Sequence, residues 1–360
     1  MIRSSAILLV LVSHALIFFF HWSYLQLREL FYITGFLGVE LFFVLSGFLI
    51  GKIILKEVLA DSSWPSLRRF YLRRWFRTLP PYFLVVLFLL ATGSPFTWQN
   101  LFFLQTFQRR TMEFFPVSWS LAIEEWFYLF VPLLLLLVGA GSQPHRRARR
   151  VLMTCIVVIG ASLAARWFVV RALNPPFAFG VAHQPPLRMD SLTLGVLLAV
   201  LAVHYPRGYE FLASRRRLLF PLALAGIAFT VGYQLFVLYR QFRVDQSVYV
   251  RTGFLLVVPV FISLLVLSLE SSHSLNRERR RSWWVRSIEF LSVTSYAAYL
   301  IHSSIFGPLS QRGAREESPG LAAGYCVAAF SLTLLASYCF YRFYERPILR
   351  LRDRVTASRR

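Results

Sequence analysis

The sequence has few lysines, few cysteines and few acidic residues. Only two of its 39 basic residues are lysines, Lys52 and Lys56, and Asp and Glu together number 17, so the formal net charge is +22. The three cysteines, Cys155, Cys326 and Cys339, form no CxxC pair and have no metal-ligand spacing. We therefore expect no disulfide and no bound metal. No small-residue cleavage site follows the first apolar run, so a cleaved signal peptide is not expected.

Long apolar runs are abundant instead. Hydrophobic residues make up 57% of the chain, whereas a soluble domain has about 45–50%. Most of the runs reach the ~17–25 residues that a helix needs to cross a bilayer. The ten runs lie at 4–21, 33–51, 79–92, 119–138, 151–170, 189–205, 218–238, 250–269, 289–308 and 322–342. The pattern predicts an all-α integral membrane protein, a bundle of about ten transmembrane helices, without the internal repeat typical of many transporters.

The arginines gather in short clusters between these runs. If the N-terminus is cytoplasmic, 28 of the 39 basic residues fall in cytoplasmic segments and 11 fall outside. The positive-inside rule then predicts a multi-pass protein of the inner (plasma) membrane with both termini in the cytoplasm. Orientation in the lipid bilayer therefore accounts for most of the positive charge, and binding of nucleic acid is not needed to explain it. Part of the basic surface remains a candidate for binding an anionic ligand.

Two ionisable residues share one face of the first run. Arg3 and His14 are eleven residues apart, and eleven steps of 100° end about 20° from three whole turns. His14 would lie roughly 16 Å deeper along the helix than Arg3. An ionisable group at depth indicates a functional site. The alternative is a neutral His14 bonded to a carbonyl of a neighbouring helix.

Carboxylates occur inside two further runs. Glu40 lies near the outer end of the second run, and Glu124 and Glu125 lie one turn into the fourth. Adjacent residues of a helix point about 100° apart, so only one of this pair can face a given site. In the alternative interpretation, Glu40 is a helix-start carboxylate, and Glu124 caps a helix or pairs with an arginine.

A basic segment precedes the third run. Arg74 and Arg77 are spaced i, i+3, so they can face one anion together. Pro80 and Pro81 follow and are expected to begin the next helix, while residues 52–78 are expected to be partly helical and interfacial. Arg74 and Arg77 could equally be a simple membrane anchor.

Three later segments combine polar and charged residues. Their candidates for a substrate-binding or a structural role are Arg188, Asp190, His302, Glu345 and Arg346. The proline after Arg346 is expected to stop the last helix or to begin an interfacial one.

Seven motifs occur in a fixed order along the chain. They are Arg3-x10-His14, GVELFFVLSGFLI, RRWFR followed by LPPY, SWSLAIEEWFY, RMDSLTLG, YLIH and YERP. Together they resemble the acyltransferase family 3 membrane proteins, which acylate hydroxyl groups of extracytoplasmic glycans and some small molecules. The resemblance extends from residue 3 to about residue 350.

The resemblance implies a fold and a reaction. It implies a ten-span membrane domain over 1–350, with a short basic cytoplasmic tail at 351–360 and without the fused extracytoplasmic esterase-like domain of some members. The donor would be a cytoplasmic acyl-coenzyme A, most often acetyl-coenzyme A, with no permanently bound cofactor. Arg3, Arg74 and Arg77 would handle this donor. His14, Glu40 and Glu124 would occupy catalytic positions.

The residue types fit this chemistry. Acyl transfer to a hydroxyl needs a base and oxyanion stabilisation, and His14 could act as base or as covalent relay. Glu40 or Glu124 could orient its imidazole, and the sequence leaves open which one does. A transporter or flippase of a lipid or glycan that relays protons through buried His and Glu is the alternative. The acceptor, the acyl chain and the oligomeric state stay open.

Overall fold

The computed structural model describes residues 1–19, 26–108, 113–139, 141, 143–241, 244–273, 283–313 and 318–357. Within these ranges the regular elements are all helical, and no strand is present. The chain divides into two compact units. Unit 1 comprises 1–42, 72–94 and 278–360, and unit 2 comprises 43–71 and 95–277. The basic positions 277, 279, 280 and 281 and the last three residues of the tail lie outside the described residues.

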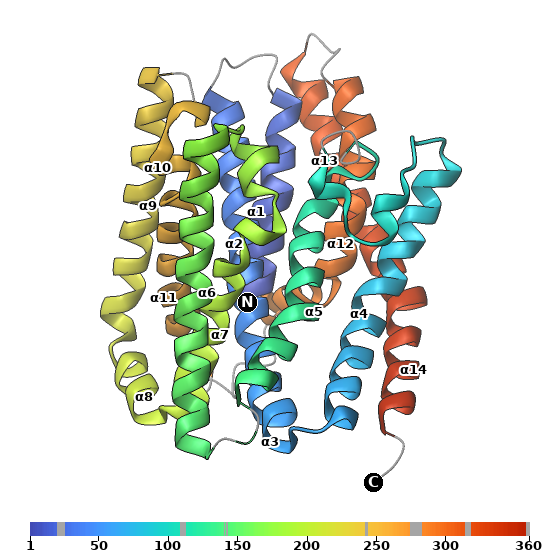
Figure 1. The fold of residues 1–360 in the computed structure, drawn as a ribbon. Coiled ribbons are helices and arrows are strands. Elements are labelled where there is room, and N and C mark those ends of the chain that lie inside the picture. The colour runs from blue at the N-terminus through green and yellow to red at the C-terminus, as the bar shows by residue number, and fades with distance from the viewer. Residues whose placement is uncertain are drawn as a thin grey trace. The chain divides into compact units, whose positions relative to one another are not determined.

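Unit 1 is built around the first helix. Its elements are α1 (Ile2–Ala15), η1 (Leu16–Phe19), the first part of α2 (Gln26–Ile53), the second part of α4 (Trp64–Ala91), α12 (Trp283–Gly313), α13 (Pro319–Phe340), η11 (Tyr341–Glu345) and α14 (Arg346–Ala357). Helix α1 packs along α12, which in turn packs along α13 (Figure 1). The Ser4 hydroxyl donates to the Ile288 carbonyl at 2.7 Å and fixes α1 against α12. A Cβ at Gly38 would lie 2.8 Å from the Ala6 carbonyl oxygen, so α2 approaches α1 closely here.

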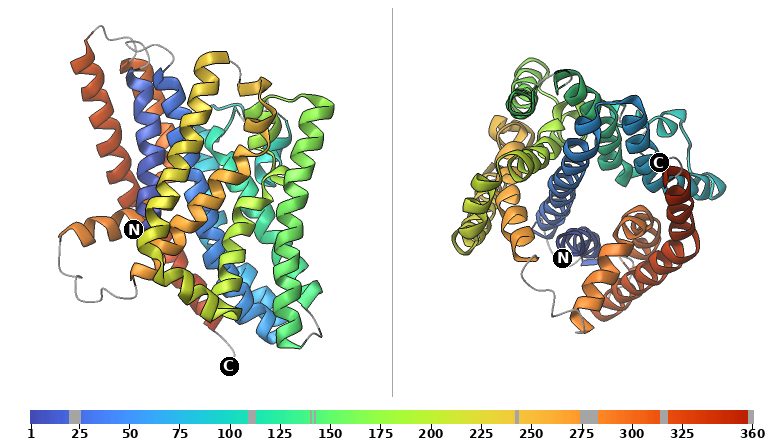
Figure 2. Two further views of the ribbon diagram at one scale, coloured as in Figure 1. Left: turned by 90° about the vertical axis from the view of Figure 1, so that its left-hand side faces the viewer. Right: turned by 90° about the horizontal axis from the view of Figure 1, so that it is seen from below.

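Unit 2 holds most of the remaining helices. Its elements are the rest of α2, η2 (Ile54–Val58), α3 (Leu59–Asp61), the start of α4, the short turns η3 (Trp98–Leu101), η4 (Gln105–Phe107) and η6 (Pro116–Ser118), α5 (Trp119–Gly139), α6 (Pro144–Leu173), η7 (Ala178–Ala182), η8 (Pro185–Leu187), α7 (Met189–His204), α8 (Pro206–Ser214), α9 (Arg216–Gln241), η9 (Val244–Gln246), α10 (Val248–Arg251) and α11 (Phe254–His273). Helix α9 lies along α11 (Figure 2), and α6 lies along α7. Gly47 and Gly195 let α2 and α7 touch, because a Cβ at Gly47 would clash with the Leu192 carbonyl.

Local sequence explains where several helices begin and end. Pro144, Pro206 and Pro319 begin α6, α8 and α13. Proline suits a first helical position because its missing N–H would have no intrahelical partner there. Asn174 ends α6 in the left-handed conformation at φ 45°, and its N–H bonds to the Val170 carbonyl. This is a common helix stop.

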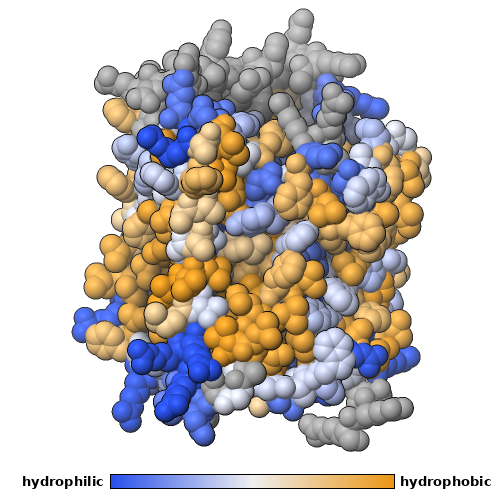
Figure 3. All heavy atoms as spheres, in the orientation of Figure 1, coloured by the Kyte–Doolittle hydropathy of each residue, from blue (hydrophilic) through white to orange (hydrophobic). Residues whose placement is uncertain are grey.

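The membrane character follows from helix length and apolarity. Within the described residues, each of the ten apolar runs overlaps a helical segment. In the part of the chain that the structure describes, seven helices are long and apolar enough to cross a membrane, and α7 with α8, bent by 109°, gives an eighth if taken as one span. Figure 3 shows apolar side chains over the middle of the helices on this face, with hydrophilic ones toward their ends. The number of ten crossings and the side of the termini stay predictions.

Helix α4 differs from the expectation drawn from its prolines. It begins at Trp64 and continues through Pro80 and Pro81 to Ala91, so the prediction that these prolines begin a helix is wrong. A proline in a helix interior removes a backbone hydrogen bond, and tertiary contacts can compensate. Two phenol hydroxyls contact this part of α4 within unit 1: Tyr296 donates to the Thr78 carbonyl at 2.8 Å, and Tyr344 donates to the Pro80 carbonyl at 3.2 Å. The expected partly helical character of residues 52–78 is confirmed.

Candidate functional site

His14 lies in the last turn of α1, with its ring held by its own helix. Its Nδ1 lies 2.9 Å from the Val10 carbonyl oxygen and 3.1 Å from the Ser13 hydroxyl. A carbonyl oxygen only accepts hydrogen bonds, so Nδ1 carries the proton in the neutral ring. The lone pair is then on Nε2. This arrangement suits a base, because Nε2 can take up a proton while Nδ1 stays anchored.

A second histidine touches His14. His302 of α12 is fully buried, and its ring centroid lies 4.5 Å from that of His14 with the planes at 82°. Its Nδ1 lies 2.7 Å from the Tyr299 carbonyl oxygen, which assigns the same tautomer to both rings. Phe306 packs near both rings. The sequence marked His302 as a candidate but did not indicate that it pairs with His14.

Arg3, Arg77 and Glu345 bring charges of opposite sign within electrostatic range of each other in unit 1, and we call this region the basic end of unit 1. Glu345, in the π-helical turn η11, is buried, and the charges of Arg77 and Arg3 act on its carboxylate. These three residues come from η11, α4 and α1. Arg74 is half-buried one turn before Arg77 on α4, and the Tyr296 and Tyr344 phenols fix α4 nearby. Two arginines whose charges act on one carboxylate leave a local excess of positive charge, as an anion site requires.

Arg346 starts α14 directly after Glu345 and is half-buried. Helix α14 begins at Arg346, directly after the π-helical turn η11. The proline that follows Arg346 therefore lies in the first turn of α14. Of the two expectations for that proline, the start of a helix is the one found. The structure gives Arg346 no contact that distinguishes a substrate-binding from a structural role.

The two carboxylates proposed as alternatives for orienting His14 lie in different units. Glu40 belongs to unit 1 and is fully buried. It lies about 160° around α2 from Gly38, the residue that touches α1, so it points away from α1. Glu124 belongs to unit 2, where it accepts a hydrogen bond from the Tyr128 hydroxyl at 2.8 Å and from the Ser46 hydroxyl at 3.4 Å. The Nδ1 atom that a carboxylate would bind in a triad is instead bonded to Val10.

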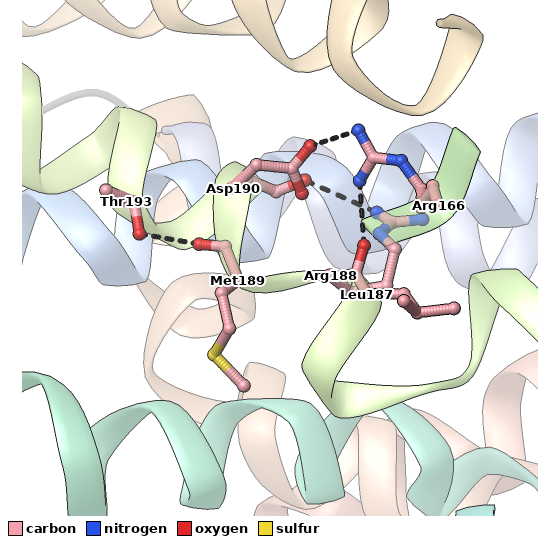
Figure 4. A network of polar contacts seen from close by, with 7 residues as sticks. Arg166, Leu187, Arg188, Met189, Asp190 and Thr193 are labelled. Carbon is pink, nitrogen blue, oxygen red and sulfur yellow. Dashed lines mark hydrogen bonds and ion pairs between the residues drawn. The ribbon is translucent and has the colours of Figure 1, made fainter. Parts of the chain in front are cut away.

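Unit 2 contains a buried ion pair that was not predicted from the sequence. Arg166 of α6 lies 2.7 Å from Asp190 at the start of α7, and both side chains are 0% exposed (Figure 4). Arg166 also donates to the Leu187 carbonyl at 2.7 Å, and Arg188 donates to the Ser191 hydroxyl at 3.3 Å. A lone arginine inside the apolar run 151–170 was the available signal, because a charge at that depth needs a partner. Asp190 and Arg188 thus belong to a network that joins α6 to α7.

A histidine beside this network is neutral at physiological pH. The ring of His183 stacks on Trp119 with centroids 4.2 Å apart. Burial, together with the positive charge of Arg188, lowers the pKa of His183 to about 3. The loop between α6 and α7 therefore holds an uncharged imidazole against an aromatic ring. Among the described residues, no three His, Cys, Asp or Glu side chains are grouped as metal ligands.

The fold and these side chains define a class of protein. Long apolar helices carry ionisable groups that are packed inside the protein, as in membrane proteins that bind or convert polar substrates. The sequence model of a family described as an acyltransferase domain matches residues 1–342. The chain therefore belongs to this acyltransferase family, which confirms the resemblance drawn from the seven motifs.

Two curated relatives are similar to the chain. They are O-acetyltransferase OatA of Staphylococcus aureus strain NCTC 8325 and that of strain COL, each 24% identical over 340 residues. Each alignment covers 87% of this chain and 52% of the relative. The chain thus spans about half the length of the curated relatives it matches. No solved structure matches the chain.

Proposed function

We propose that the protein is a membrane-bound O-acyltransferase. It moves an acyl group from acyl-coenzyme A on the cytoplasmic side to a hydroxyl of an extracytoplasmic or membrane-associated glycan or small molecule. The observation that carries this proposal is the ring of His14, whose Nδ1 is anchored on Val10 and whose Nε2 carries a lone pair. Arg3 lies on the same helix, at the basic end of unit 1.

His14 supplies the base in this reaction. The Nε2 atom takes the proton of the acceptor hydroxyl while the hydroxyl oxygen attacks the acyl carbon. The carbon–sulfur bond then breaks, its electron pair stays on sulfur, and the thiolate takes the proton. If His14 instead carries the acyl group as a covalent relay, the same Nε2 attacks the thioester first. Glu40 and Glu124 remain the candidate carboxylates for supporting the base.

Arg3, Arg74 and Arg77 bind the donor. Coenzyme A carries phosphates, and guanidinium groups bind phosphate oxygens with paired hydrogen bonds. Glu345 supports this role because its buried carboxylate lies within electrostatic range of Arg3 and Arg77 and attracts both guanidinium groups before the donor arrives. Binding in this way needs no permanently bound cofactor.

The names of the relatives support acetyl as the acyl group. The high apolar helix content supports a multi-pass location in the plasma membrane, and the bias of basic residues supports cytoplasmic termini. The acceptor is a hydroxyl compound of the outer face, a glycan or a smaller molecule.

The test supplies radiolabelled acetyl-coenzyme A to inside-out membranes from cells with and without the protein. We expect label to appear in extracted glycan or lipid-linked material only when the protein is present. A protein that transports a glycan or lipid would instead change the distribution of that compound across the membrane and incorporate no label. That result would overturn the proposed function.

A further inference from the structure

The Nε2 atom of His302 is buried and accepts no hydrogen bond from any of the described residues. Its Nδ1 atom is bonded to the Tyr299 carbonyl at 2.7 Å, so the ring cannot turn over while it keeps that bond. A buried polar atom without a partner is uncommon in folded proteins and usually has a functional or ligand-dependent explanation. The tautomer that Nδ1 imposes makes Nε2 a lone-pair acceptor, so its missing partner is a group that offers a proton.

His14 is the neighbour that can offer one. The two ring centroids are 4.5 Å apart, and both rings are anchored through Nδ1 on carbonyls of their own helices. No carboxylate of the described residues hydrogen-bonds to either ring. In a triad a carboxylate stabilises the imidazolium that forms when the histidine takes a proton. Here the second imidazole is the basic group in contact with the first.

We propose that His302 is a proton-relay residue that works with His14, an inference that rests on the proposed acyl transfer. His14 takes the hydroxyl proton as the carbon–oxygen bond forms. The proton passes to Nε2 of His302 and then to the thiolate that leaves when the carbon–sulfur bond breaks. One proton has then travelled from oxygen to sulfur, and both imidazoles are neutral again. Both rings are anchored through Nδ1, so neither can turn to carry the proton from the hydroxyl to the thiolate. Two imidazoles together can pass the proton over a distance that one anchored ring could not span.

Two substitutions separate this role from the alternatives. The amide nitrogen of His302→Asn can occupy the position of Nδ1 and keep the bond to Tyr299. The amide of His302→Gln can reach the position of Nε2 but cannot carry a proton between groups. We expect both variants to purify as folded protein. We also expect acyl transfer per folded molecule to fall by ~10²-fold or more in both, the range for removal of an acid–base group.

Each other outcome overturns the relay. If His302→Asn retains activity, His302 is structural and acts through Nδ1 alone. If His302→Gln retains activity, Nε2 of His302 serves only as a hydrogen-bonding group in the wild type and passes no proton. His183→Gln is the matched control, because it removes a buried imidazole from unit 2 and should keep most of the activity. Acyl transfer by the wild type in the same assay must be present, and its absence would count against the proposed function itself.

Discussion

The guanidinium of Arg166 and the carboxylate of Asp190 lie 2.7 Å apart, with both side chains fully buried between α6 and α7. Taking two charges out of water is costly, and the attraction between them offsets that cost only while both are present. Removing one partner leaves an uncompensated charge in an apolar interior. The pair therefore makes the packing of α6 on α7 depend on both residues.

We expect Arg166→Met or Asp190→Leu alone to reduce stability by about 3–5 kcal/mol. The double variant should be destabilised much less than the sum of the two, because no buried charge remains. Thermal unfolding of the detergent-purified variants measures both effects. Arg171→Met is the control, since Arg171 lies exposed on the same helix. Strictly additive effects would show that the two side chains do not interact in the folded protein.

The neutral His183 makes stability depend on pH. Its pKa in the folded protein is about 3, whereas an unfolded chain has a histidine pKa of about 6.5. The unfolded state therefore binds a proton that the folded state does not, and stability falls as pH decreases from about 6.5 toward 3, by at most about 1.4 kcal/mol per pH unit. We expect the melting temperature of His183→Gln to fall less than that of the wild type between about pH 6.5 and about pH 4.5, within this window. Parallel curves would exclude this histidine as a source of acid sensitivity.

The topology prediction rests on the bias of 28 basic residues against 11. Reporter fusions placed after residues 145, 215 and 360 should all report the cytoplasm, because each position adjoins a cluster of arginines. Alkaline phosphatase and a fluorescent protein give opposite signals on the two sides and serve as controls for each other. An extracytoplasmic signal at the C-terminus would show an odd number of crossings.

The sequence predicted the helices better than their partners. Each apolar run overlaps a helix within the described residues, because a long apolar stretch is sufficient to indicate one. Arg3 and His14 could be placed on one helix face because that needs only the 3.6-residue period. The proximity of His14 to His302 could not be predicted, because it depends on which helices become neighbours and how each is rotated. The same limit applies to Glu345, which lies more than 260 residues from Arg77 and more than 340 from Arg3.

Two errors arose because the contacting residues lie far along the chain. Arg166 was not predicted as part of a site because it lies alone in an otherwise apolar run, and its partner Asp190 is 24 residues further along the chain. Pro80 and Pro81 were predicted to start a helix because proline usually avoids helix interiors. The phenols of Tyr296 and Tyr344 that accompany them come from residues more than 200 positions away.

Arg74 and Arg77 provide a test of donor binding. We expect Arg74→Ala or Arg77→Ala to weaken use of acyl-coenzyme A by roughly 1.5–3 kcal/mol for each charge-assisted hydrogen bond that is removed, or about 10- to 150-fold. The effect should appear in KM for the donor, measured with purified protein at a fixed acceptor concentration. Arg73→Ala is the control, because Arg73 lies on the same helix and is exposed. Equal effects at all three positions would favour a general basic anchor over a donor site.

His14 is the residue on which the proposed reaction depends most. We expect His14→Ala to lower acyl transfer by ~10²–10⁴-fold, the range for removal of a general base, and by more if His14 carries the acyl group. Insertion into the membrane should not suffer, because alanine is smaller and apolar. A structural histidine would behave in the opposite way: its removal would lower the yield of folded protein while the surviving molecules stayed active. The measurement is therefore specific activity per folded molecule after size-exclusion chromatography. If His14→Ala keeps more than about a tenth of the wild-type value, which is outside the range for removal of a base, His14 is not the base and the reaction proceeds through another group.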